Sequence, residues 1–170
     1  MFNSECGNVW GYEGSAGDVD WSWDYHIMMN EFRRHPQVCG WLYTEHHDVI
    51  NEWNGYWRYD RSNKFTGVEQ LVEGMSIRDF HTPFYIASER ELCRNVKAGE
   101  TVEVPLFLSC MTDIDLDGEL QLEMHLVHID KLGAQKTTSV GTRKLQYAPW
   151  LNTELDPATI TMPNRPGLAI

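Results

Sequence analysis

The feature that most constrains this chain is a change in the spacing of its apolar residues. Beyond Pro83, apolar residues alternate with other residues, most clearly over Val102–Leu108 and Leu120–Leu126. A period of two is typical of strands that bury one face and expose the other. Turns bearing Asp and Gly separate these runs. The second half of the chain is therefore predicted to be an antiparallel β-sandwich.

The first half differs because it holds most of the large aromatic residues. Six of the seven Trp and five of the seven Tyr precede residue 60. Trp21, Tyr25, Met28 and Phe32 recur at the spacing of one helical face, so we predict a helix over Asp18–His35. Asp18 or Asp20, just before the aromatic stripe, is expected to cap the start of this helix.

Short apolar runs flank the predicted helix. Residues 1–5 and Val38–Tyr43 are typical of strands that are buried on both faces of a parallel sheet. Strand, helix and strand in that order predict a βαβ unit, and a second helix is expected near Gly67–Arg78. The first region is thus α/β and the second all-β, and we expect them to meet between Lys64 and Pro83.

The charge of the chain argues against two classes of partner. With 14 Lys and Arg against 25 Asp and Glu, the formal net charge is −11. Nucleic acids and anionic membranes bind basic surfaces, so neither is expected. No apolar run approaches the ~20 residues of a membrane helix. The first residues lack the features of a signal peptide, and the compartment is left open.

Three patterns invite a metal or disulfide interpretation, and none is predicted to be one. The four cysteines form no CxxC pair, which excludes a zinc ribbon. His46, His47 and Asp48 are adjacent, and adjacent residues seldom aim at one ion. Asp113–Gly118 matches the opening of an EF-hand loop, but Met124 stands where the bidentate Glu is required. We predict an acidic hairpin turn there and no metal site.

Three residues near predicted strand ends are candidates for chemistry. Glu5 stands where a strand is expected to end, the position from which α/β barrels build active sites, and a carboxylate there can be a nucleophile or an acid/base group. On position alone, a surface or capping role is the simpler interpretation of Glu5. Trp41 and Tyr43 share one strand face and could form a platform for a sugar ring, with core packing as the alternative.

Several motifs together resemble glycoside hydrolase family 2, which includes β-galactosidases, β-glucuronidases and β-mannosidases. Asn3–Gly7 is similar to the S-E-F/Y-G segment that carries the catalytic nucleophile, with Cys6 in place of the usual aromatic residue. Gly40–Asp48 is similar to the pattern Y/W-T-x-x-x-D. Glu52–Arg61 then matches N-G-x-x-x-Y-D-R.

The resemblance implies both a fold and a set of site residues. Residues 1–80 would be the last two βα units of a TIM (β/α)8 barrel, and residues 81–170 would be a partial, truncated Ig-like antiparallel β-sandwich. Glu5 would be the catalytic nucleophile. The substrate-binding candidates are Tyr43, Trp41, Trp10 and Glu45.

The resemblance also implies an activity and a missing group. Family members hydrolyse β-glycosides with retention, so the expected partner is a carbohydrate substrate and no cofactor is needed. The acid/base Glu of the family follows an Asn at the end of barrel strand four, which would lie upstream of Met1. We therefore expect the chain to be a fragment of a longer enzyme and to be inactive alone. The sugar, the linkage and the oligomeric state are left open.

Two alternatives remain from the sequence. The first is a non-catalytic carbohydrate-binding or interaction module on the β-sandwich, which exposed aromatic residues on one sandwich face would favour. The second is an unrelated α/β domain in which Glu5 is structural. Glu5 and Tyr43 pointing into a common cleft would count against that second alternative.

Overall fold

The structure is a computed structural model that describes residues 1–7, 20–50, 52–70, 74–117 and 119–170. Strands make up 41% of it, and one helix of seven or more residues occurs in the described part. The elements in chain order are β1 (Phe2–Cys6), α1 (Ser22–Arg34), β2 (Gly40–Tyr43), the 3₁₀ turns η1 (Val68–Gln70) and η2 (Ile77–His81), β3 (Phe84–Ala87), β4 (Thr101–Cys110), β5 (Leu120–Asp130), β6 (Gln135–Leu145), β7 (Asn152–Thr161) and β8 (Gly167–Ala169).

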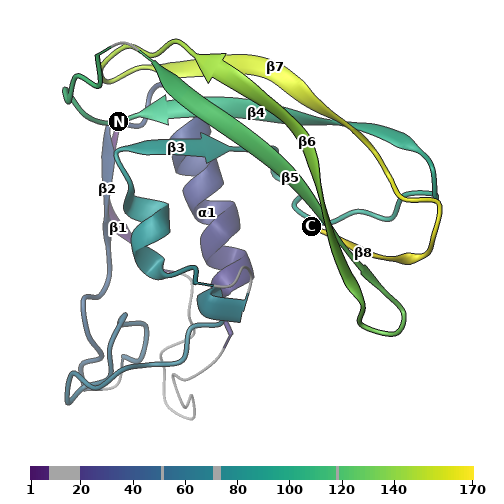
Figure 1. Cartoon of the computed structure of the whole chain (residues 1–170). Helices are drawn as coiled ribbons and strands as arrows, with labels where there is room; N and C mark the ends of the chain where they lie inside the picture. The colour runs from purple at the N-terminus through teal and green to yellow at the C-terminus, as the bar shows by residue number, and fades with distance from the viewer. Residues whose placement is uncertain (8–19, 51, 71–73, 118) are drawn as a thin grey trace. The chain divides into compact units, whose positions relative to one another are not determined.

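The strands form three small sheets, which Figure 1 shows as ribbons. β1 pairs with β2, a second sheet has the order β3-β4-β7, and a third has the order β6-β5-β8. The chain divides into two compact units, Met1–Tyr85 and Ile86–Ile170, so the division falls within β3. We describe each unit by itself.

Helix α1 confirms the predicted amphipathic helix with shorter bounds. The Asp20 carboxylate accepts hydrogen bonds from the backbone N–H of Ser22 at 3.1 Å and from its hydroxyl at 2.6 Å, just before the first turn. Asp18 lies outside the described residues. His35 adopts an extended conformation (φ −95°, ψ 113°), as expected of a residue that precedes proline, and the helix therefore ends at Arg34.

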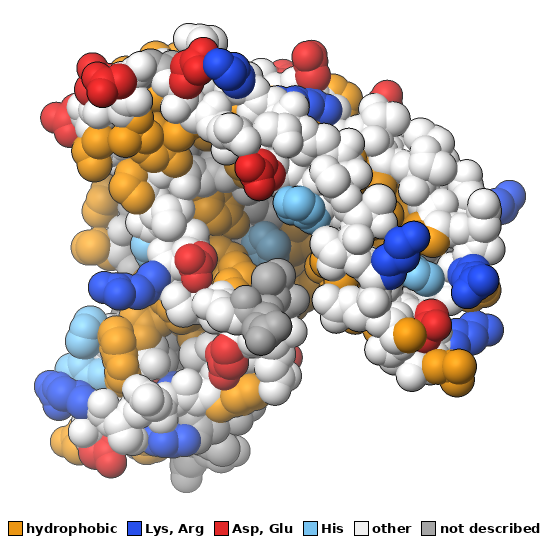
Figure 2. Space-filling model, in the orientation of Figure 1, with side chains coloured by type: hydrophobic (Ala, Val, Ile, Leu, Met, Phe, Trp, Pro, Cys, Tyr) orange, Lys and Arg blue, Asp and Glu red, His pale blue; other side chains and the backbone are white. Residues whose placement is uncertain are grey.

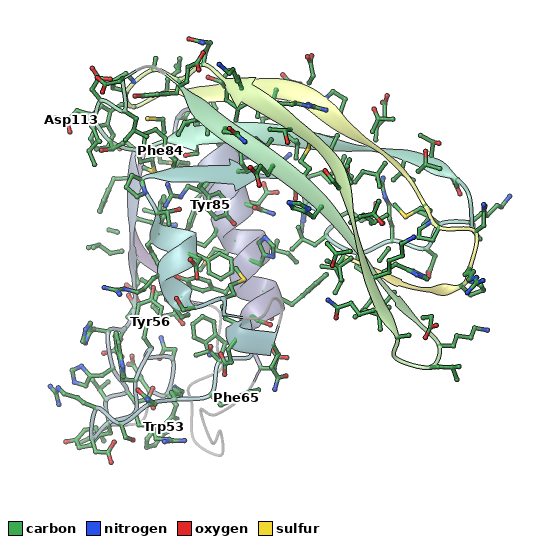
Figure 3. The ribbon with its side chains drawn as sticks, viewed as in Figure 1. Trp53, Tyr56, Phe65, Phe84, Tyr85 and Asp113 are labelled. Atoms are coloured by element: carbon green, nitrogen blue, oxygen red, sulfur yellow. The ribbon has the colours of Figure 1, made fainter. Side chains whose placement is uncertain are left out.

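The first unit is organised around one face of α1. Trp21, Tyr25 and Met29 are buried there with Val68 of η1 and Phe80 of η2. The predicted stripe is therefore correct in direction, although Met29 is fully buried while Met28 packs at its edge. Partly buried side chains complete this core, including Phe32, Trp41, Tyr43, Tyr56 and Tyr85, the last two of which are labelled in Figure 3.

The predicted second helix over Gly67–Arg78 is wrong. Short 3₁₀ turns at Val68–Gln70 and Ile77–His81 stand in this part of the chain. Residues 74–76 between them are not helical, and residues 71–73 lie outside the described part. The turn η2 begins with a capping box in which the Ser76 backbone N–H donates to the Asp79 carboxylate at 2.7 Å. Such a local cap supports one turn without the continued apolar stripe of an α-helix.

The predicted fold class is also wrong. β1 and β2 do pair in parallel, with Phe2 opposite Gly40 and Cys6 opposite Tyr43. However, the described structure is mostly strands in small sheets and does not contain two βα units of a TIM barrel. Barrel strands are covered on both faces, whereas Phe2 is 54% exposed and Leu42 57% exposed. The short apolar runs therefore form a two-stranded sheet rather than part of a closed barrel.

The second unit confirms the strands expected from alternation. β4 pairs antiparallel with β7, and β5 pairs antiparallel with both β6 and β8. Val102, Leu106 and Leu108 of β4 are buried as their period of two requires. Other buried members of this unit are Cys110, Leu126, Leu145 and Ala158.

A proline-bearing irregularity interrupts the ladder between β4 and β7. Pro105 stands where the register shifts, opposite a segment of β7 that contains Asp156 and Pro157. Because proline has no N–H to donate, strands accommodate it at such bulges. The guanidinium of Arg143 on β6 donates to the carbonyls of Asp156 and Pro157, the latter at 2.7 Å. This contact links the two sheets of the second unit.

The acidic segment that begins at Asp113 forms a turn, but not the predicted hairpin. It joins β4 to β5, which belong to different sheets. The Asp115 carboxylate accepts hydrogen bonds from the Asp117 backbone N–H at 3.0 Å and from the Tyr147 hydroxyl at 3.4 Å. Asp115 thus serves the turn itself, as aspartates in such turns commonly do.

The surface shows how the excess of acidic residues is distributed. On the face drawn in Figure 2, acidic and basic side chains both occur, and several Lys and Arg side chains lie near one another at the right of the view. Within the part of the chain that the structure describes, no helix combines the length and apolar character that crossing a bilayer requires.

Candidate functional site

Glu5 lies near the carboxyl end of β1 and is exposed. Its backbone N–H donates to the side-chain oxygen of Asn3 at 3.1 Å. The neighbouring strand is held next to it by a hydrogen bond of 2.7 Å from the Thr44 backbone N–H to the Cys6 carbonyl. The end of β1 and the segment after β2 therefore lie side by side, with the Glu5 carboxylate open to solvent.

Tyr43 is the most densely packed of the predicted substrate-binding residues. Its ring stacks on Tyr56 at a centroid distance of 4.4 Å and on Trp21 at 5.9 Å, and it meets the edge of Tyr25. Burial, followed by the charges of Tyr56 and Cys6, raises the pKa of its hydroxyl, so Tyr43 stays neutral at physiological pH. The ring is half-buried and packs against the aromatic core of the first unit.

Trp41 takes the core-packing role that the sequence left as its alternative. Its ring stacks on Phe32 of α1 at 5.4 Å, and the Arg33 guanidinium lies 5.1 Å from its centroid. Arg33 also donates to the Phe80 carbonyl at 3.0 Å. These contacts direct Trp41 toward α1 and make it part of the packing of the first unit.

Glu45 belongs to a group of carboxylates that follows β2. Desolvation raises the pKa of its side chain, and a hydrogen bond to Glu52 and the charges of Glu52, Asp48 and Glu5 raise it further. Desolvation and Glu52 raise this pKa most, and the Glu5 charge raises it least. Trp10, the remaining predicted residue, lies outside the described residues.

A buried ion pair organises the segment that follows Glu45. The Lys64 ammonium lies 2.6 Å from the Asp48 carboxylate, and both side chains are almost fully buried. The same carboxylate accepts the Gly55 backbone N–H at 2.9 Å, while Lys64 also donates to the Trp53 carbonyl. A Cβ at Gly55 would clash with the backbone of His47 and Asp48, so this close approach requires glycine at position 55.

Two tyrosines and one histidine form a hydrogen-bonded network next to Tyr43. The Tyr25 hydroxyl lies 2.7 Å from the Tyr56 hydroxyl and 2.6 Å from His81 Nε2. Burial lowers the pKa of His81, and the Arg33 charge lowers it further. A neutral His81 can therefore accept a hydrogen bond from the Tyr25 hydroxyl. No spacing in the sequence links these three residues to one another.

A shallow hollow of about 310 Å³ lies in the segment between β2 and η1. Asp48, Trp53, Arg58, Tyr59 and Asp60 line it. The motif N-G-x-x-x-Y-D-R contains Arg58, Tyr59 and Asp60, and it was the signal that could have directed attention here. From the sequence, that motif supports only the resemblance, and no role is predicted for these three residues.

The histidines before Asp48 do not form a cluster with it. The rings of His46 and His47 lie 5.8 Å apart at 80°, and His46 lies 4.7 Å from the ring of Trp57. The Asp48 carboxylate is occupied by Lys64 and Gly55. Among the residues that the structure describes, no group of three or more His, Cys, Asp or Glu could hold a metal ion.

Comparisons with known proteins do not assign the chain to a group. A scan of protein-family models found no family that matches, and searches of curated proteins and of solved structures found no significant match.

Proposed function

We propose that the first unit carries part of a site for the retaining hydrolysis of β-glycosides, with Glu5 as the nucleophile. The observation that carries the proposal is the position of Glu5, an exposed carboxylate at the end of β1 beside the segment after β2. That segment contributes the carboxyl of Glu45, whose pKa is raised by desolvation first and by neighbouring carboxylates, of which Glu5 is one. The motifs around Glu5 and after Tyr43, which resemble glycoside hydrolase family 2, support the same function.

In the proposed mechanism, a Glu5 oxygen attacks the anomeric carbon and forms a glycosyl-enzyme ester. The bond from that carbon to the leaving oxygen breaks, and a carboxylic acid gives its proton to that oxygen. The resulting carboxylate then takes a proton from water, which attacks the anomeric carbon and releases Glu5. The acid/base carboxyl must stand about 5–5.5 Å from the nucleophile, and we propose that it comes from outside residues 1–170.

The alternative of a carbohydrate-binding module on the second unit lacks a comparable observation. Within the described part of that unit, Trp150 is the large aromatic side chain that is exposed, at 65%. A single exposed ring does not make the aromatic face that this alternative requires.

The proposed function predicts that the leaving group decides whether the chain acts alone. Acid catalysis contributes about 10²–10⁴-fold, so methyl β-glycosides should not be hydrolysed at a measurable rate. Dinitrophenyl β-glycosides need no proton on departure and should turn over slowly. Glu5→Ala should abolish that turnover, and added azide should restore it with formation of the α-glycosyl azide.

The matched control is Glu91→Ala, which removes an exposed carboxylate from the second unit. Its turnover should equal that of the unchanged chain. Equal rates for the unchanged chain and its Glu5→Ala variant would show that Glu5 is structural.

A further inference from the structure

The hollow between β2 and η1 differs in chemistry from the surface beside Glu5. Two of its walls are aromatic, Trp53 and Tyr59, and Tyr59 is 55% exposed. Trp53 is labelled in Figure 3. The volume of the hollow, about 310 Å³, lies at the lower end of the ~300–1,000 Å³ range of small-molecule sites. A space of this size suits one ring-sized ligand.

Hydrogen bonds order the polar groups and part of the backbone around the hollow. The Lys64 ammonium donates to the Asp48 carboxylate and to the Trp53 carbonyl. The Arg58 guanidinium donates to the Asn63 carbonyl, and the Asp60 carboxylate accepts the Ser62 backbone N–H at 2.9 Å. Groups that are already ordered lose less conformational entropy when a ligand binds.

The charges that line the hollow cancel. Asp48 is paired with buried Lys64, and Asp60 stands with Arg58 in the lining. Hydrogen bonds from Ser62 lower the pKa of Asp60, so this carboxylate stays ionised at neutral pH and can accept further hydrogen bonds. A balanced pair of one acceptor and one cation favours a neutral ligand that carries several hydroxyl groups over a strongly charged one.

Aromatic walls and polar groups together fit the two sides of a sugar ring. The C–H face of a pyranose is apolar and can pack on an aromatic ring, while its hydroxyls can donate to a carboxylate and accept from a guanidinium. Trp53 and Tyr59 supply the first kind of contact, and Asp60 and Arg58 supply the second.

From this arrangement, we infer that the hollow lined by Trp53, Tyr59, Arg58 and Asp60 is a binding subsite for a neutral pyranose, separate from Glu5. The inference rests on the carbohydrate chemistry of the proposed function but does not require Glu5 to be a nucleophile. Asp48 and Lys64 are positioning residues for this subsite.

The test is titration of the 170-residue chain with methyl β-galactopyranoside, methyl β-glucopyranoside and methyl β-mannopyranoside, followed by saturation-transfer NMR and calorimetry. At least one of them should bind with millimolar affinity, and methyl β-glucuronide should bind more weakly than its neutral counterpart. Trp53→Ala and Tyr59→Ala should each weaken binding at least tenfold. Trp150→Ala, which removes an exposed Trp from the second unit, should leave binding unchanged.

Tyr59 is exposed, so Tyr59→Ala tests the subsite even where Trp53→Ala disturbs folding. The inference is overturned if none of the neutral glycosides binds, or if Trp53→Ala and Tyr59→Ala bind as well as the unchanged chain. Sugar binding here without any Glu5-dependent turnover would contradict the proposed function alone. Glu5-dependent turnover without binding at this hollow would contradict the subsite alone.

Discussion

The two units of this chain hold themselves together in different ways. In Ile86–Ile170, strands of ten or eleven residues pair over most of their length, so backbone hydrogen bonds and alternating side chains carry the structure. In Met1–Tyr85, the strands have five and four residues. That unit depends instead on an aromatic core and on buried polar contacts between segments far apart in the sequence. Regular pairing is therefore a property of one unit, and long-range side-chain contacts are a property of the other.

The largest effects should come from the two cores, and they should be separable. Phe80→Ala removes a fully buried ring from the first unit and should cost about 3–5 kcal/mol of the free energy of unfolding. Leu108→Ala removes a buried aliphatic side chain from the second unit and should cost about 2–5 kcal/mol of the free energy of unfolding. Residue-resolved amide exchange should show protection lost in the unit that carries the substitution. Equal loss in both units for both variants would contradict the division.

Buried and exposed ion pairs sharpen the comparison. Lys64→Met leaves the Asp48 carboxylate buried without its cation, which should destabilise the first unit by about 3–5 kcal/mol. Lys144→Met breaks an exposed pair with Glu119 in the second unit and should cost about 0–1 kcal/mol. Residue-resolved amide exchange at increasing urea concentration gives the free energy of unfolding of each unit separately, so each variant is measured in the unit that carries it. Similar costs for the two variants would show that the buried pair does not organise the first unit.

Elements that depend on local sequence pattern were predicted correctly, and elements that depend on long-range contacts were not. The spacing of Val102, Leu106 and Leu108 predicted β4, because a period of two is a local property of the chain. The stripe from Trp21 to Phe32 predicted α1 for the same reason. In contrast, the apolar runs that form β1 and β2 predicted buried barrel strands. That prediction was wrong because local pattern does not determine how many strands pair in a sheet.

The candidate site was predicted only in part. Motif resemblance selected Glu5, Tyr43, Trp41, Trp10 and Glu45. Lys64 pairs with Asp48, sixteen residues away, and no regular spacing in the sequence predicts this pair. The same holds for the contact of Tyr25 with His81. The hollow beside Trp53 is lined by Asp48, which Lys64 holds, and could not be predicted without the fold.

A smaller effect is expected from the pH dependence of the first unit. The pKa of His81 is lowered in the folded state, so the unfolded state binds more protons between that value and about 6.5. Stability should therefore fall as pH falls below about 6.5 and level off below the folded pKa. His81→Gln keeps an acceptor for the Tyr25 hydroxyl but does not titrate, and it should reduce this slope in urea unfolding between pH 7 and 5. An unchanged slope would show that His81 is not the titrating group.

The smallest effect should lie in the second unit, at the turn between β5 and β6. The backbone N–H groups of Leu132 and Ala134 donate to the Asp130 carboxylate at 2.8 and 2.9 Å, and they lower its pKa. The stability that these hydrogen bonds to the Asp130 carboxylate contribute is present above the unfolded pKa of Asp130 and is lost as pH falls through its folded pKa. The protection factors of the Leu132 and Ala134 amides should fall below about pH 4 and should lose this dependence in Asp130→Asn. Protection of these two amides that changes with pH in the same way in the unchanged chain and in Asp130→Asn would contradict the role of Asp130 in the turn.

The central claim is that Glu5 forms a covalent bond to a sugar, and trapping that bond tests it most directly. A 2-deoxy-2-fluoro-β-glycosyl fluoride loses fluoride without needing a proton, so the acid/base carboxyl is not required. Incubation of the chain with the galacto, gluco and manno reagents, followed by peptide mass spectrometry, should show one fluoroglycosyl group on the peptide that contains Glu5. Glu5→Gln should remain unlabelled. Absence of the adduct with all three reagents, or labelling that persists in Glu5→Gln, would contradict the assignment of Glu5 as the nucleophile.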